Sequence, residues 1–147
     1  MDFPLLSLIT FLPLVGAALL VLLKGDEDSV ARKSRMITLA VTAVTFLLSL
    51  PVMIGFDANI VDFQFVEKKV WFDSYGISYH MGIDGISLFF VMLSTFLTPL
   101  CILASWKSIT MRVREYMIAF LLLETFMIGT FCALDAVLFY VFFEGVL

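Results

Sequence analysis

Long apolar runs separated by short polar stretches make up almost the whole chain. Four of these runs carry almost no charge, and they cover residues 3–23, 36–56, 86–106 and 116–134. A fifth begins at residue 135 and is still apolar at residue 147. A helix needs about 20 apolar residues to cross a hydrocarbon core about 30 Å thick. The pattern therefore predicts an all-α polytopic membrane protein that starts with five spans, of which the fifth is truncated.

Basic residues are distributed unevenly among the connections between these spans. The first connection contains Lys24, Arg32, Lys33 and Arg35, and the third contains Lys107, Arg112 and Arg114. The second connection contains only Lys68 and Lys69. Connections rich in Lys and Arg normally stay on the cytoplasmic side of the membrane. We therefore expect the N-terminus outside and the first and third connections in the cytoplasm or matrix.

The connection between the second and third spans, residues 57–84, has a composition of its own. Residues 60–66 and 70–72 are rich in β-formers, and Glu67-Lys68-Lys69 stands between them. Two such runs on either side of a short polar stretch are typical of a hairpin. The sequence predicts a short hairpin on the outer membrane surface, with its turn at residues 67–69.

Composition excludes several classes of protein. The chain is 62% hydrophobic and 15% charged with a mean hydropathy of +1.08, which no soluble domain of this size accommodates. A net charge of −4 without a basic block gives no reason to expect nucleic acid. Cys101 and Cys132 stand alone in apolar runs and are interpreted as packing residues, so no metal or cofactor site is expected. His80, the single histidine of the sequence, is interpreted as a surface residue in preference to a proton relay.

Two carboxylates fall inside the predicted spans. Glu124 lies near the middle of the fourth span, and Glu144 follows Asp135 by nine positions. Nine residues of helix place Glu144 about 13 Å into the bilayer, close to its midplane. An ionised side chain there costs on the order of 3 kcal/mol, so such residues normally face protein or a water-filled cavity.

A carboxyl group held between desolvation and a nearby cation changes its protonation when that cation moves, which is what a proton relay requires. The candidates for proton translocation are Glu144, Glu124 and Asp135. The alternative for the two glutamates is a protonated side chain that only bonds a neighbouring helix. For Asp135, and equally for Asp84, the alternative is a helix cap. No Lys or Arg lies inside a span, so a basic partner of Glu144 is expected elsewhere in a longer chain or in another subunit.

Three stretches are similar to one protein family. Residues 75–90 read YGISYHMGIDGISLFF, residues 103–107 read LASWK, and residues 134–144 read LDAVLFYVFFE. Together they resemble subunit M of NADH-quinone oxidoreductase, which is respiratory complex I, and its mitochondrial counterpart, chain 4. The combination of Gly-Ile-Asp-Gly-Ile-Ser with Phe-Phe-Glu carries the resemblance.

The resemblance implies an antiporter-like subunit of about fourteen spans, of which this chain is roughly the first third. It implies a proton-translocating module of the membrane arm, in the bacterial or mitochondrial inner membrane, beside other antiporter-like subunits. FMN, iron–sulfur clusters and quinone are then expected in partner subunits, and none in this chain. In that family the Phe-Phe-Glu glutamate, here Glu144, pairs with a lysine of the seventh span.

Two other functions stay open at this stage. Subunits of multisubunit cation/proton antiporters share the glutamate of the fifth span, so an antiporter subunit is the second interpretation. The third is a small membrane scaffold whose buried acids are incidental. Copurifying flavin and iron–sulfur signals separate complex I from an antiporter.

Overall fold

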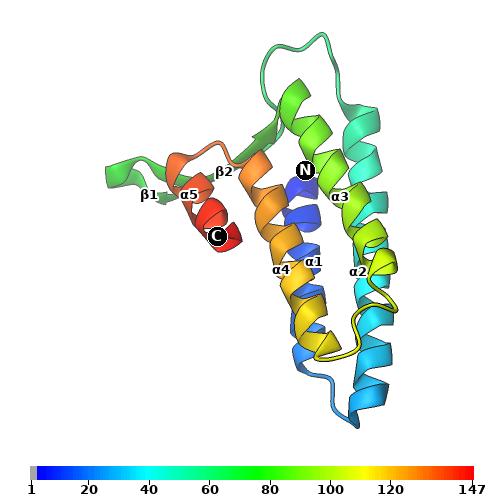
Figure 1. Ribbon diagram of the computed structural model, residues 1–147. Coiled ribbons are helices and arrows are strands. Elements are labelled where there is room, and N and C mark those ends of the chain that lie inside the picture. Colours follow the sequence, from blue (N-terminus) through cyan, green and yellow to red (C-terminus); the bar gives the residue numbers. More distant parts are fainter. Residues whose placement is uncertain (1–2) are drawn as a thin grey trace.

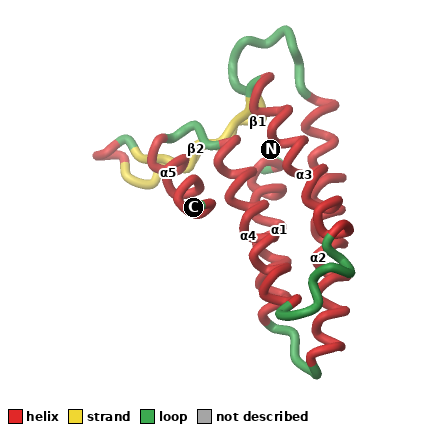
Figure 2. The backbone as a smooth tube through the Cα atoms, viewed as in Figure 1, coloured by secondary structure: helices red, strands yellow, loops and turns green. Residues whose placement is uncertain are grey.

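A computed structural model of the chain describes residues 3–147 and is mostly helical. The elements in chain order are α1 (Leu5–Val21), α2 (Glu27–Gly55), β1 (Gln64–Phe72), the short 3-10 turn η1 (Asp73–Tyr75), β2 (Ile77–Ile83), α3 (Gly85–Ala104), α4 (Val113–Cys132) and α5 (Ala136–Val146). The helices α1 to α4 lie side by side in an elongated bundle (Figure 1). α5 packs beside α4, and the hairpin β1–β2 crosses one end of the bundle (Figure 2).

Three of the five helices are long and apolar enough to cross a membrane, namely α2, α3 and α4. α1 has 17 residues and α5 has 11. At 1.5 Å per residue these measure about 26 Å and about 17 Å. The prediction of a mostly helical membrane chain is confirmed, although the first and last helices are shorter than the predicted spans. The expected orientation stays a prediction.

α2 begins at Glu27, nine residues before the predicted start of the second span at residue 36. Two acids, Glu27 and Asp28, occupy its first turn, where negative charge stabilises the positive end of the helix dipole. The Lys and Arg residues that follow are good helix formers. Polarity ends a membrane span but does not end a helix, so α2 continues past its apolar section.

The hairpin lies in the predicted connection, but its turn was predicted at the wrong place. β1 pairs antiparallel with β2, and Lys68 and Lys69 stand inside β1 opposite His80 and Tyr79. The chain reverses at η1 and at Gly76, whose φ of 66° is left-handed. Glycine adopts that conformation without steric cost, whereas residues 67–69 contain no residue that favours a tight turn.

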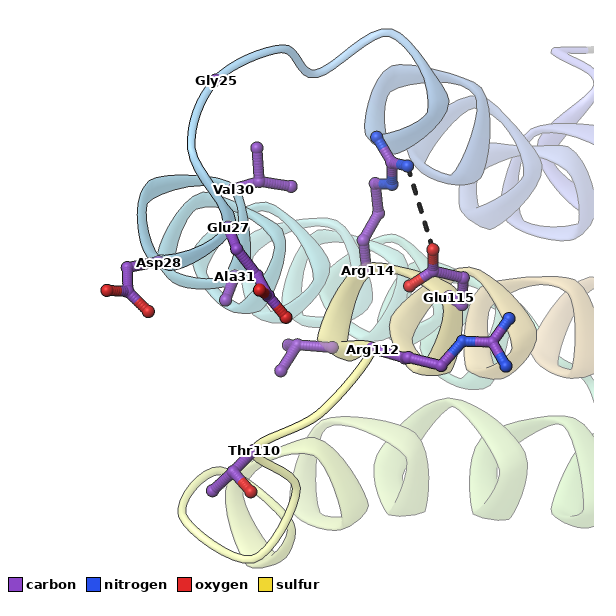
Figure 3. Close-up of a pocket in the computed structure, with 10 residues that line it drawn as sticks. Gly25, Glu27, Asp28, Val30, Ala31, Thr110, Arg112, Arg114 and Glu115 are labelled. Carbon is purple, nitrogen blue, oxygen red and sulfur yellow. Dashed lines mark ion pairs between the residues drawn. The ribbon is translucent and has the colours of Figure 1, made fainter.

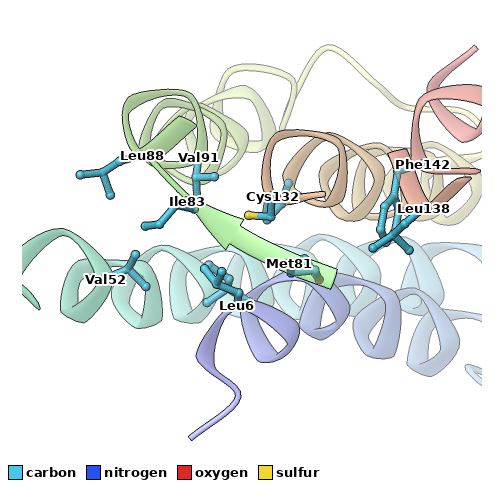
Figure 4. Packing of buried hydrophobic residues seen from close by; sticks show 11 residues of the cluster. Leu6, Val52, Met81, Ile83, Leu88, Val91, Cys132, Leu138 and Phe142 are labelled. Atoms are coloured by element: carbon cyan, nitrogen blue, oxygen red, sulfur yellow. The ribbon is translucent and has the colours of Figure 1, made fainter. Parts of the chain in front are cut away.

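A hydrophobic cluster ties the hairpin to all five helices. Its buried members are Leu6 and Ile9 of α1, Val52 of α2, Met81 and Ile83 of β2, Leu88 and Val91 of α3, Ile128 and Cys132 of α4, and Leu138 and Phe142 of α5 (Figure 4). The backbone N–H of Leu134 also donates to the carbonyl of His80 at 2.8 Å. β2 is therefore held against the end of the bundle by both apolar and backbone contacts.

The face of α2 that points into the bundle is polar. It carries Ser34, Thr38, Thr42, Thr45 and Ser49, all with 0% exposure. The Ser49 and Thr95 hydroxyls of α2 and α3 lie 3.1 Å apart, within hydrogen-bond distance. Small polar side chains let membrane helices approach closely because they occupy little space. The hydroxyls of Thr42, Thr45 and Ser49 also donate to backbone carbonyls of α2, whereas those of Ser34 and Thr38 have no partner within residues 3–147.

Candidate functional site

Glu124 is the most deeply buried acid among the described residues. It lies on α4 with 1% of its surface exposed. Neither of its carboxylate oxygens has a hydrogen-bond partner in residues 3–147. A buried polar group without a partner costs about 1–3 kcal/mol, and more when it is charged. Native proteins normally give such a group a hydrogen-bonding or charged partner. Glu124 therefore marks a candidate site.

A pocket of about 270 Å³ lies between α3 and α4, with Glu124 in its wall. The other lining residues are Phe90, Leu93, Ser94, Leu97, Thr98 and Cys101 of α3 with Phe120, Leu123, Met127 and Phe131 of α4. The hydroxyl groups of Ser94 and Thr98 already donate to backbone carbonyls of α3, at 2.8 Å each. The pocket is therefore apolar except for two hydroxyl groups, one thiol and one unpaired carboxyl.

Glu144 lies on α5 and is exposed in the described part of the chain. α5 packs on α4 through Phe142, whose ring covers Gly129, and through Gly145, which lies under Phe126. Glu144 is two residues from Phe142, about 200° around the helix, so it points away from α4. Within residues 3–147 no segment covers Glu144, so its side chain can contact another protein segment or lipid.

The structure does not bring the two glutamates together. Gly129, which contacts α5, is five residues from Glu124, or about 140° around α4. Glu124 points toward α3 and the bundle interior, because it lines the α3–α4 pocket. The two carboxyl groups therefore belong to separate sites on opposite sides of α4.

Asp135 sits at the N-terminus of α5 and caps it. Its carboxylate accepts hydrogen bonds from the backbone N–H groups of Val137 at 2.9 Å, Leu138 at 3.2 Å and Ser78 at 3.1 Å. These bonds, led by the one from Ser78, lower the pKa of Asp135 from its ordinary 3.8. The cap interpretation therefore describes its geometry, while a part in proton transfer stays a prediction.

Asp84 has the same geometry at the start of α3. It accepts from the N–H groups of Ile86 and Ser87, and the Ser87 hydroxyl accepts from the N–H of Asp84. This reciprocal capping box lowers the pKa of Asp84, chiefly through the Ser87 N–H. The cap predicted from the sequence is confirmed.

Glu67 is a structural acid that the sequence analysis missed. From β1 it accepts hydrogen bonds from the N–H groups of Leu6 and Ser7 at the start of α1, at 2.9 and 3.2 Å, and from the Ser7 hydroxyl. The Ser7 hydroxyl also lies 2.5 Å from that of Tyr79, whose pKa is raised mainly by burial. Pro4, the residue before α1, makes no side-chain cap, and this missing cap was the only signal in the sequence.

The end of the bundle that carries the basic connections contains a second pocket, of about 350 Å³ (Figure 3). Arg114 lies 3.8 Å from Glu115 there, the one ion pair within residues 3–147. Arg114 also donates to the Leu23 carbonyl at 3.3 Å, and Arg35 donates to that of Ile109 at 2.7 Å. The arginines thus join connections at this end of the bundle, and neither Glu124 nor Glu144 is paired with a described base.

No group of three or more metal-ligating side chains occurs in the described part of the chain. Cys132 is buried and Cys101 is exposed, and neither forms a disulfide. His80 is half-buried in β2 opposite Lys68.

Comparison with known proteins gives a consistent result. Residues 8–130 match the family model described as NADH-ubiquinone oxidoreductase chain 4, amino terminus. The chain is 53% identical to NADH-quinone oxidoreductase subunit M of Rhodobacter capsulatus, over 96% of this chain and 27% of that protein. It is 46% identical to NADH-ubiquinone oxidoreductase chain 4 of Arabidopsis thaliana, over 97% of this chain and 28% of that protein. The chain thus spans less than a third of the length of these relatives.

Proposed function

The chain belongs to the family of NADH-ubiquinone oxidoreductase chain 4 and bacterial subunit M, and from this membership we propose that it is part of a proton-translocating membrane-arm subunit of an NADH:quinone oxidoreductase. The observation that carries the proposal is the match over residues 8–130 together with Phe142-Phe143-Glu144 on α5. In the proposed role the chain carries no redox centre. Quinone reduction elsewhere in the complex supplies the free energy.

Glu144 is the proposed proton-carrying residue. It stands on an apolar helix, and its side chain points away from α4, where a basic group from another segment has access to it. Such a cation stabilises the carboxylate when it is near and favours protonation of the carboxyl when it withdraws. Glu144 would therefore take up and release a proton as its ion-pair partner moves.

Glu124 and Asp135 are proposed as further groups on the proton path. Glu124 is buried without a hydrogen-bond partner, which supports this role. The protonation of such a carboxyl responds to any charge that approaches it. Asp135 lies at the end of α5 that carries the hairpin, where it accepts a hydrogen bond from Ser78. There it would be near the aqueous exit of a path that passes Glu144.

The proposed surroundings follow from the family. The membrane is the bacterial or mitochondrial inner membrane, and the partners are the other membrane-arm subunits, the neighbouring antiporter-like ones first. FMN, iron–sulfur clusters and quinone belong to partner subunits. Moving one proton against the membrane potential takes about 2.3 kcal/mol per 100 mV, which the redox reaction has to deliver.

The test is Glu144→Gln in the full-length protein within its complex. Glutamine keeps the size and hydrogen bonding of the side chain and removes the ionisable group. We expect assembly to be unchanged and proton pumping coupled to NADH oxidation to fall by at least about tenfold, because loss of an essential proton carrier interrupts the path. Pumping is measured with a pH-sensitive dye in sealed vesicles.

Glu115→Gln is the matched control. Glu115 is a partly exposed acid on α4, at the end of that helix far from its contact with α5. Pumping in this variant is expected to equal that of the wild type. Wild-type pumping in Glu144→Gln would refute the relay role. Loss of pumping in both variants would show that the assay responds to general damage.

A cation/proton antiporter subunit is the second candidate, because such subunits share the glutamate represented by Glu144. Purification from native membranes distinguishes the two. Flavin and iron–sulfur spectra that copurify with the chain support complex I, and a preparation without them supports the antiporter.

A further inference from the structure

The α3–α4 pocket has a shape suited to a chain-like molecule. Its lining extends along α3 from Phe90 to Cys101, which is about 16 Å of helix. The rings of Phe90 and Phe131 stack at one end of it, with centroids 5.0 Å apart. The volume of about 270 Å³ is close to the lower end of the range for small-molecule sites.

The rim of this pocket faces out of the bundle. Phe90, Leu93 and Leu97 are 46%, 50% and 43% exposed, and Leu123 on the α4 side is 37% exposed. Exposed apolar side chains on a membrane-spanning helix contact lipid tails or another apolar segment. Within residues 3–147 no other segment covers this rim, so a molecule dissolved in the lipid would be able to enter the pocket from that side.

The wall of the pocket specifies the polar group of its occupant. Glu124 is 1% exposed and both its oxygens lack a partner within residues 3–147, so an occupant that supplies a hydrogen-bond donor would satisfy them. No Lys, Arg or His lines the pocket. An amine satisfies the carboxyl best, because it donates a hydrogen bond and also balances the negative charge.

We propose that the α3–α4 pocket is a binding site for a hydrophobic amine that enters from the lipid and pairs with Glu124. The apolar body lies between α3 and α4, along the side chains from Phe90 to Cys101. The proposal does not depend on the transport function, because it requires only the unpaired carboxyl and the open rim.

The test uses N,N′-dicyclohexylcarbodiimide on the full-length protein in its native membranes. This apolar reagent adds a carboxylic acid across one C=N bond: the carboxyl oxygen bonds to the central carbon and the acid proton goes to a nitrogen. The acyl group then moves to the second nitrogen, which gives a stable N-acylurea with no atom lost. Water would instead hydrolyse the first adduct, so the stable product reports a carboxyl in a dry, lipid-accessible pocket.

We expect peptide mass spectrometry to find the N-acylurea on Glu124. N,N-dimethyldecylamine should reduce this labelling to background, whereas decane, with the same chain and no amine, should not. A water-soluble carbodiimide should leave Glu124 unmodified. Glu124→Gln should remove the adduct from this peptide.

Two further variants distinguish the contribution of the pocket to labelling from that of the Glu124 carboxyl. Leu97→Trp fills the pocket from its exposed rim and should abolish labelling while Glu124 is still present. Leu47→Trp is the matched control, because Leu47 is an exposed leucine of α2 outside the pocket, and labelling should persist. An unlabelled Glu124 in the wild type would overturn the proposal and indicate that protein covers the pocket. Labelling that the amine does not reduce would overturn it as well.

Discussion

Glu67, Asp84 and Asp135 each accept hydrogen bonds from backbone N–H groups at the start of a helix, whereas Glu124 accepts none. The first N–H groups of a helix have no partner within it, so a carboxylate there satisfies them and meets the positive end of the dipole. A carboxylate in the middle of α4 finds all backbone N–H groups already bonded. A carboxylate beside the first turn of a helix therefore has a structural role as a cap, whatever else it does, whereas Glu124 has no such role.

Removal of the Glu67 carboxylate is expected to loosen the start of α1. Glu67→Ala deletes the acceptor for the Leu6 and Ser7 N–H groups and should destabilise the protein by about 2 kcal/mol, the typical cost of losing a charged cap. Thermal unfolding in detergent measures the change. Lys68→Ala alters the exposed neighbour in β1 and should have little effect. Equal stability of the two variants would contradict the capping role.

The charge on Asp135 is expected to make the junction of β2 and α5 sensitive to acid. Hydrogen bonds from Ser78 and from the first turn of α5 lower its pKa below the ordinary 3.8. The stabilisation is therefore present above pH 3.8 and disappears as the pH falls through the lowered value. Asp135→Asn keeps an acceptor but cannot ionise.

Thermal unfolding of wild type and Asp135→Asn across this range provides the measurement. Wild type should be the more stable above pH 3.8, and the difference should shrink as the pH drops further. A difference that stays constant with pH would show that the charge contributes nothing.

At the scale of elements, α5 is attached to α4 by close contact. A Cβ added at Gly129 would stand 2.6 Å from the Phe142 ring, and one at Gly145 would stand 2.8 Å from Phe126. Small residues at such crossings let two helices approach within packing distance. This contact sets the direction in which the side chain of Glu144 points.

Gly129→Ala is expected to force α5 away from α4, because the Phe142 ring has to move. Overpacking of this kind costs about 1–3 kcal/mol. Gly85→Ala is the matched control, since a Cβ there meets nothing within 4 Å. Thermal unfolding compares the two. If Glu144 has the proposed role, proton pumping in the complex should also fall in Gly129→Ala. An unperturbed Gly129→Ala variant would mean that α4 and α5 are not tightly packed.

At the scale of the whole molecule, large apolar side chains cover the outside of the bundle, including Ile54, Ile86, Phe89 and Phe96. Its polar residues instead gather inside, along α2, and at the ends. A water-soluble protein does not leave so much apolar surface uncovered. The arrangement fits a bundle surrounded by lipid and by further protein segments.

The expected orientation is tested with single cysteines at Lys33 and Asn59, in a background where Cys101 and Cys132 are replaced by Ser. Lys33 belongs to the basic end of α2, and Asn59 follows the other end. An impermeant maleimide added from outside should label the cysteine at position 59 only. The cysteine at position 33 should be labelled only after the membranes are lysed. The reverse result would invert the topology.

The local parts of the fold were predictable from the sequence, for specific reasons. Apolar runs of span length predicted the helices, and Asp84 and Asp135 before apolar runs signalled two N-terminal caps, both of which the structure contains. A hairpin was predicted in the correct connection, but its strands were not: the predicted runs 60–66 and 70–72 meet within β1, and β2 (Ile77–Ile83) lies beyond both. Register depends on Gly76 and on the packing of Met81 and Ile83 under the bundle, which no local pattern of β-formers reveals.

The sequence by itself determined that the chain is helical and apolar and that acids stand within its spans, because hydrophobicity and helix length are properties of neighbouring residues. Only the tertiary structure decided which acid is buried and what surrounds it. Glu124 and Glu144 look alike in sequence, yet one lines the α3–α4 pocket and the other points away from α4. That difference arises from how the helices are rotated against one another, and rotation is set by contacts such as Phe142 on Gly129 between residues distant in sequence.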